Sequence, residues 1–126
     1  MAKEDCWTIP GSMPSSAIAN IGKSIIWQND RYVFSAKVYY GSVASSIGSW
    51  DINDDGSTIF STTLMIGASA TEGAEIVSDS LSGTDVIEVS AKSVITLNYV
   101  DGHATNPGAD ATVIIWSMPS GWRYRP

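Results

Sequence analysis

The chain has 126 residues, enough for one domain with a single hydrophobic core and too few for two. Thirteen acidic residues and seven basic residues give a net charge of −6, which argues against a protein that binds the phosphates of nucleic acid. A single cysteine, Cys6, excludes an internal disulfide. Charged residues are sparse, at 16%, and Ser, Thr, Gly, Val and Ile dominate, which favours strands and turns over helices.

Residues 1–22 are predicted to form an N-terminal arm. Prolines and glycines interrupt any regular element there, and three apolar side chains stand between them as candidate anchors, Trp7, Ile9 and Met13. The arm holds no apolar segment of the signal-peptide type, and no apolar run in the chain approaches the length of a membrane span. We therefore expect a protein made in the cytoplasm, with no secretory signal and no membrane partner.

Strand patterns begin after this arm. Residues 23–28 and 31–40 are predicted to form a tight hairpin around the turn signal Asn29-Asp30. The alternation in the second of these strands assigns one set of side chains to its outer side: Arg31, Val33, Ser35, Lys37 and Tyr39. Residues 41–56 are expected to form a long connection that carries Trp50, and a third strand follows it.

The most regular alternation lies in residues 85–102. Ile87 and Val89 share one side of an extended chain, and Ile95, Leu97 and Tyr99 form the apolar side after Ser93. This stretch predicts a hairpin or a bulged long strand at the centre of the core. A short edge strand is expected near residues 75–78, and a last strand, apolar on both faces, over residues 111–118.

About seven short strands separated by turn signals predict an all-β fold. Residues 23–118 are expected to form a single β-sandwich, immunoglobulin-like or jelly-roll, with a small β-barrel as the alternative. Residues 119–126 begin with a proline that stops the last strand, and they are predicted to form a C-terminal arm.

The turn Asp51–Gly56 is similar to the start of a calcium loop. Oxygen-bearing side chains occupy its first, third and fifth positions, namely Asp51, Asn53 and Asp55. The twelfth position is Thr62, so the bidentate acid of such a loop is missing. We therefore favour a solvated turn over a metal site, and we expect no cofactor.

Catalytic groups are sparse in this sequence. His103 is the only histidine, and no Gly-x-Ser-x-Gly elbow supplies a nucleophile beside it. The carboxylates that glycoside hydrolysis would need lie in predicted turns or on the solvent-exposed face of a predicted strand: Glu72, Glu75, Asp79, Asp85 and Glu88. The sequence therefore predicts a non-enzymatic protein.

Five tryptophans are more informative. Trp27 and Trp116 lie within predicted strands and are expected in the core, whereas the other three lie in an arm, a loop and a tail. Trp50 could stack on sugar rings, as in carbohydrate-binding modules. We favour a second interpretation, in which the arms anchor neighbouring subunits through Trp7, Ile9, Met13, Trp122, Arg123, Tyr124 and Arg125.

A start at Met-Ala-Lys, one β-rich domain, a single cysteine and aromatic arms together resemble the small accessory proteins of tailed-phage virions. Capsid cement, or decoration, proteins are the type that the chain resembles. The resemblance implies a sandwich module, often trimeric, on the virion surface, which self-associates and clamps neighbouring coat subunits. The alternative is a carbohydrate-binding or adhesin-like module, such as a component of a phage tail or fibre.

Overall fold

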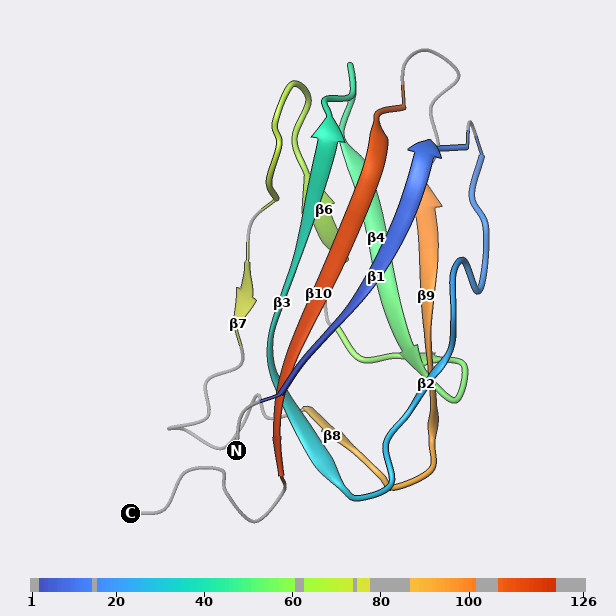
Figure 1. Ribbon diagram of the computed structural model, residues 1–126, viewed down its shortest axis with the longest axis vertical. Helices are drawn as coiled ribbons and strands as arrows, with labels where there is room; N and C mark the ends of the chain where they lie inside the picture. The colour runs from blue at the N-terminus through green and yellow to red at the C-terminus, as the bar shows by residue number, and fades with distance from the viewer. Residues whose placement is uncertain are drawn as a thin grey trace.

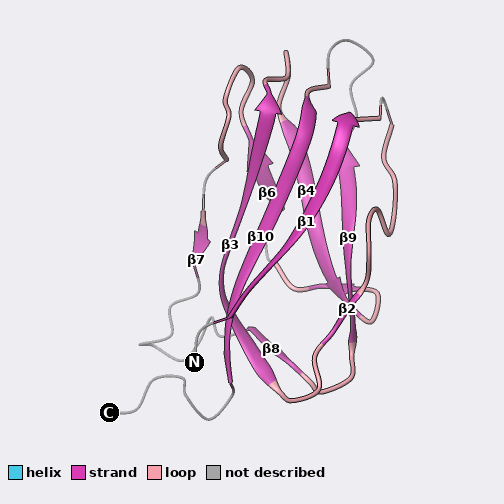
Figure 2. Cartoon of the chain, in the orientation of Figure 1, coloured by secondary structure: helices cyan, strands magenta, loops and turns pink. Residues whose placement is uncertain are grey.

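The computed structural model describes residues 3–14, 16–60, 63–73, 75–77, 87–101 and 107–119. Ten strands run through these residues and no helix occurs among them, which confirms the predicted all-β class. The strands form two antiparallel sheets that face each other as a β-sandwich (Figure 1, Figure 2).

Each sheet contains five strands. Sheet A consists of β1 (Lys3–Ser12), β3 (Arg31–Ser42), β7 (Ile76–Val77), β8 (Ile87–Val89) and β10 (Ala109–Pro119), in the order β1-β10-β3-β7, with β8 also paired to β3. Sheet B consists of β2 (Ile25–Ile26), β4 (Gly48–Asp54), β5 (Ser57–Thr58), β6 (Leu64–Ile66) and β9 (Val94–Asp101), in the order β2-β9-β4-β5, with β6 also paired to β4. All of these pairings are antiparallel.

The expected N-terminal arm is a strand of the sandwich, so that prediction was wrong. β1 pairs with β10 from Lys3 opposite Ser117 to Ser12 opposite Ala109. Its residues alternate between a buried Trp7 and an exposed Cys6 and Thr8 on either side, which is the pattern of a half-buried strand. The prolines and glycines that suggested an arm lie at or beyond its end, where the register with β10 shifts.

The predicted hairpin of residues 23–28 and 31–40 was also wrong. β2 pairs with β9 in sheet B, whereas β3 pairs with β8 and β10 in sheet A. The two crossings between the sheets lie side by side, because the Lys92 amide donates to the Trp27 carbonyl at 2.8 Å and the Ala91 amide donates to an Asp30 carboxylate oxygen at 2.7 Å. Residues 25–33 and 87–95 therefore form one antiparallel ribbon that bends from sheet B into sheet A.

The core lies between the sheets and takes alternate side chains from both. β9 supplies Ile95, Leu97 and Tyr99, each at most 1% exposed, as the alternation predicted. Sheet A supplies the facing side chains, among them Val113 and Ile115 of β10, which are fully buried. Close packing of this kind is what fixes the two sheets against each other.

A β-bulge in β3 changes which of its side chains face inward. Trp116 lies opposite Ser35, and Ser117 lies opposite Val33, so Phe34 is an extra residue with no opposite partner in β10. After the bulge, the inward and outward side chains of β3 are those that the alternation predicted. Before the bulge they are reversed, so Val33, which was predicted on the outer side, faces the core. The core side chains of β3 are Val33, Ala36, Val38 and Tyr40.

Candidate functional site

The three expected anchors of the N-terminal segment belong to the core. Trp7 is 1% exposed, and its indole N–H donates to the Lys23 carbonyl at 2.7 Å. Met13 is 3% exposed, and Ile9 is half-buried against the core. The Trp7 and Met13 side chains are buried in the core of the same chain, so the prediction that these two insert into a partner was wrong.

Trp50 is likewise unavailable for stacking on a sugar. It belongs to β4 and not to a connection, it is fully buried, and its indole N–H donates to the Tyr40 hydroxyl at 3.1 Å. Its ring also packs against Tyr99, with the ring centroids 4.8 Å apart. Trp27 is 3% exposed, which confirms its predicted place in the core, and it donates to an Asp5 carboxylate oxygen at 3.0 Å.

Trp116 was predicted in the core and lies on the other side of its sheet. Its neighbours in the strand, Ile115 and Ser117, are fully buried, so alternation directs Trp116 outward, where it is half-buried. Its indole N–H donates to a Glu4 carboxylate oxygen of β1 at 2.9 Å. Residues 111–118 carry apolar side chains on both faces, so hydrophobic periodicity could not show which face points into the core.

Asp51–Asp54 belong to β4, so the predicted turn is shorter than expected and only Asp55–Gly56 join β4 to β5. Asp55 and Gly56 are the two turn residues of this hairpin, with φ of 50° and 90°, the backbone that a tight hairpin turn needs. Asp51 accepts hydrogen bonds from the Ile52 amide at 2.9 Å and from the Thr58 hydroxyl at 2.6 Å, and Asp55 accepts one from the Val94 amide at 2.8 Å. These carboxylates stabilise the hairpin of β4 and β5, and Asn53 is half-buried within β4.

Several predicted residues lie outside the residues that the structure describes. They are His103, Asp79, Asp85, Trp122, Arg123, Tyr124 and Arg125. Glu72, Glu75 and Glu88 are exposed, as predicted for carboxylates on wet surfaces. In the described part of the chain no three His, Cys, Asp or Glu side chains gather closely enough to hold a metal ion.

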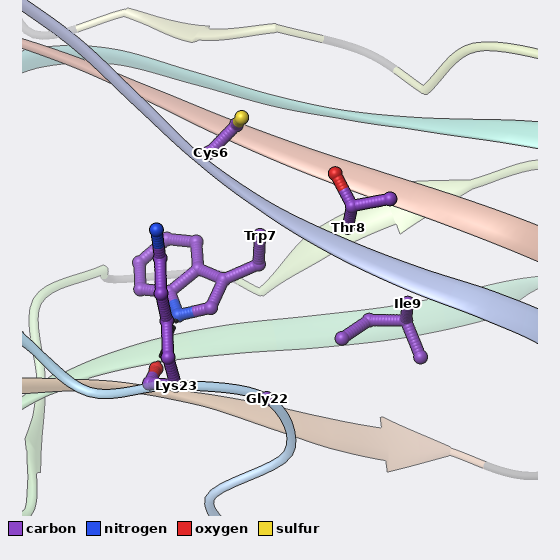
Figure 3. Close-up of a pocket in the computed structure, with 6 residues that line it drawn as sticks. All are labelled: Cys6, Trp7, Thr8, Ile9, Gly22 and Lys23. Carbon is purple, nitrogen blue, oxygen red and sulfur yellow. Dashed lines mark hydrogen bonds between the residues drawn. The ribbon is translucent and has the colours of Figure 1, made fainter.

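The free edge of β1 is the first candidate site. β10 pairs with one edge of β1, and no strand among the described residues pairs with the other. A groove of about 330 Å³ lies there, lined by residues 6–9 of β1 and by Gly22 and Lys23. Figure 3 shows Trp7 and Ile9 directed toward the Gly22–Lys23 segment, with Cys6 and Thr8 on the opposite side of the strand. Among the described residues, therefore, no strand takes up the backbone N–H and C=O groups on this edge, and such an edge can pair with a further strand.

The outer face of sheet A carries the second candidate site. A groove of about 370 Å³ is lined there by Phe34, Ser35, Lys37, Tyr39, Glu75 and Trp116. The register places Trp116 opposite Ser35 and Thr112 opposite Tyr39, with Ile114 and Lys37 between them. Lys37 and Tyr39 were predicted on the outer side of their strand and lie there. The groove itself was not predicted, because only the pairing of β3 with β10 places its aromatic residues on one surface.

Lys37 and Glu75 are the charged residues that line this second groove, and both have polar partners. The Lys37 ammonium contacts a Glu72 carboxylate oxygen at 2.8 Å and lies 5.2 Å from the centre of the Tyr39 ring. The hydrogen bond to Glu72 is the main reason that the pKa of Lys37 is raised above its usual value. The Ser35 hydroxyl donates to a Glu75 carboxylate oxygen. The groove thus offers half-buried aromatic rings edged by ordered polar groups.

No helix with the length and apolar character of a membrane span occurs in the described part of the chain. Comparison of the sequence with models of protein families found no match, and comparison with the curated proteins found none either.

Proposed function

We propose that this protein is a non-enzymatic structural subunit that self-associates by adding strand to strand along β1. The observation that carries the proposal is the edge of β1 with which no described strand pairs, and the groove beside it. A long strand edge is a template for pairing with another chain, and main-chain hydrogen bonds supply its affinity. The more specific role, a decoration subunit on a phage capsid, rests on the sequence resemblance, with Trp122, Arg123, Tyr124 and Arg125 as the proposed contacts to the coat.

The charges on β1 disfavour some registers for a second copy of the chain as the added strand. In an antiparallel pair that continues sheet A about a two-fold axis, outward side chains lie opposite outward side chains. Registers centred on Glu4 or Asp5 place like charges directly opposite each other, which is destabilising. A register centred on Cys6 avoids this, because it places Glu4 opposite Thr8 of the second copy and Lys3 opposite Ile9.

The same register fits the regular part of the strand. β1 keeps an unbroken register with β10 from Lys3 to Ile9, and Cys6 is the middle residue of that stretch. Directly opposite residues in antiparallel strands have Cα atoms roughly 4.5–5.5 Å apart, which a disulfide can bridge. Cys6 is exposed, so its thiol reports on the pairing without any substitution.

Mild oxidation of the purified protein should therefore yield a covalent dimer, measured on a non-reducing gel, at concentrations where light scattering shows a dimer or a larger assembly. The matched control carries Cys6→Ser and Thr8→Cys, which moves the thiol along the same exposed side of β1. In the proposed register the two moved thiols lie about 13 Å apart along the strands, so they should not cross-link. A monomer at every concentration, or equal cross-linking of both proteins, would contradict the proposal.

A further inference from the structure

We infer that the groove on the outer face of sheet A is a binding site for a neutral oligosaccharide. Half of its six lining residues are aromatic, namely Phe34, Tyr39 and Trp116, and all three are half-buried. Its volume of about 370 Å³ lies within the range of roughly 300–1,000 Å³ typical of small-ligand sites. The site lies apart from the free edge of β1, because β10 separates β1 from β3.

The chemistry of the lining residues fits a sugar. A pyranose ring presents an apolar face of C–H groups and a rim of hydroxyls, so it needs an aromatic surface with hydrogen-bonding groups beside it. Tyr39 and Trp116 supply rings, and Ser35, Lys37 and Glu75 supply the hydroxyl, ammonium and carboxylate at their edges. The indole N–H of Trp116 is held by Glu4, which fixes the orientation of that ring.

The spacing of the rings favours a chain of sugars over a single compact ligand. The Trp116 row and the Tyr39 row are four residues apart along the strands, or about 13 Å. None of the ring-to-ring contacts among the described residues joins Phe34, Tyr39 and Trp116 to one another. An aromatic cage around one cation would bring the rings together, whereas rings spread along a sheet can each stack on a different sugar unit.

The charges of the groove favour a neutral ligand. Lys37 is neutralised by Glu72, and Glu75 is the remaining charge among the lining residues. An acidic sugar would meet Glu75 and gain little from the paired Lys37. A neutral sugar loses nothing from this pairing, and its hydroxyls can donate to Glu75 and accept from Lys37.

The test is a titration of the full chain with cellohexaose, chitohexaose and mannohexaose, followed by amide chemical shifts in nuclear magnetic resonance, after a screen on a neutral glycan array. Saturable binding to at least one glycan is expected, with shifts confined to β3, β10 and the Glu72–Glu75 region. Tyr39→Ala and Trp116→Ala should each raise the Kd at least about tenfold. Tyr39→Phe, which keeps the ring, should bind within about threefold of the natural protein.

Met65→Ala is the matched control, because Met65 is 51% exposed on β6 of the other sheet and its loss should leave the Kd unchanged. If Trp116→Ala fails to fold, the inference is tested by comparing the Kd of Tyr39→Ala with that of Tyr39→Phe. Absence of binding on the array and in all three titrations would overturn the inference, as would binding that Tyr39→Ala leaves intact. These outcomes are separate from the cross-linking at Cys6, so either proposal can fail alone.

Discussion

Tyr40 is a core residue that makes the stability of the folded protein depend on pH in the alkaline range. Its hydroxyl accepts the indole N–H of the fully buried Trp50, and burial is the main reason that its pKa is raised above the usual 10.0. Tyr40→Phe leaves that N–H without an acceptor, so we expect a loss of about 1–3 kcal/mol in the free energy of unfolding at neutral pH.

Above pH 10 the unfolded chain loses the Tyr40 proton while the folded protein keeps it, so the natural protein loses stability as the pH rises. The Phe variant has no such proton. The gap in stability between the two proteins should therefore narrow above pH 10, as urea unfolding at a series of pH values would measure. The raised pKa of Lys37 acts in both proteins alike and cancels in the comparison. A gap that widens would contradict this account.

Gly73 is a position where only a hydrogen atom fits. A Cβ atom there would overlap the carbonyl oxygen of Met65 and lie 3.0 Å from Val38. Gly73→Ala should therefore cost about 1–3 kcal/mol of stability, measured by thermal or urea unfolding. Gly67→Ala is the control, because the nearest atom to its Cβ would be that of Ala70 at 4.0 Å, and its effect should stay within about 0.5 kcal/mol.

At the scale of the elements, the bent ribbon of residues 25–33 and 87–95 joins the two sheets. Its corner is held in part by Asp30, whose carboxylate accepts the Ala91 amide at 2.7 Å. Asp30→Ala should lower the free energy of unfolding by about 1 kcal/mol, and Asp30→Asn, which keeps an acceptor, should restore most of it. Both sheets share this ribbon, so circular dichroism and tryptophan fluorescence should report one common transition. Two separate transitions in Asp30→Ala would contradict the shared role.

The alternation of apolar and polar residues predicted the strands that have one apolar face. It failed where nearby prolines, glycines or serines suggested an arm or a loop. Ile95, Leu97 and Tyr99 were assigned correctly because polar residues separate them. The alternation of Trp7 and Ile9 with Cys6 and Thr8 is equally regular, and the nearby prolines and glycines hid it. Trp50 and Ile52 likewise alternate with polar residues in a stretch whose serines and glycines suggested a loop.

The candidate sites were less predictable, because they depend on pairing between distant strands. Tyr39 and Trp116 are separated by most of the chain, and only the register of β3 with β10 places them on one surface. The bulge at Phe34 also shifts the phase of β3, and no turn residue marks it. Sequence periodicity gives the face of each strand, but it does not give the neighbour of that strand.

In the molecule as a whole, sheet A carries the two surfaces on which the two proposals rest. Its edge strand β1 is open to another strand, and its outer face holds the aromatic groove between β3, β10 and the Glu72–Glu75 region. Pairing through β1 would extend the sheet and set the grooves of two copies on one continuous face. A subunit that binds weakly to a single glycan would then gain avidity from assembly.

The pairing of β1 with β10 also has a consequence during synthesis on the ribosome. β1 is the earliest of the described strands to be translated, and its one partner, β10, is the last. Until Ala109–Pro119 has emerged, β1 lacks the strand with which it pairs in sheet A. Such long-range pairing makes folding slow and leaves apolar surface open to aggregation. The pairing of β1 with β10 can therefore form only after β10 has been translated.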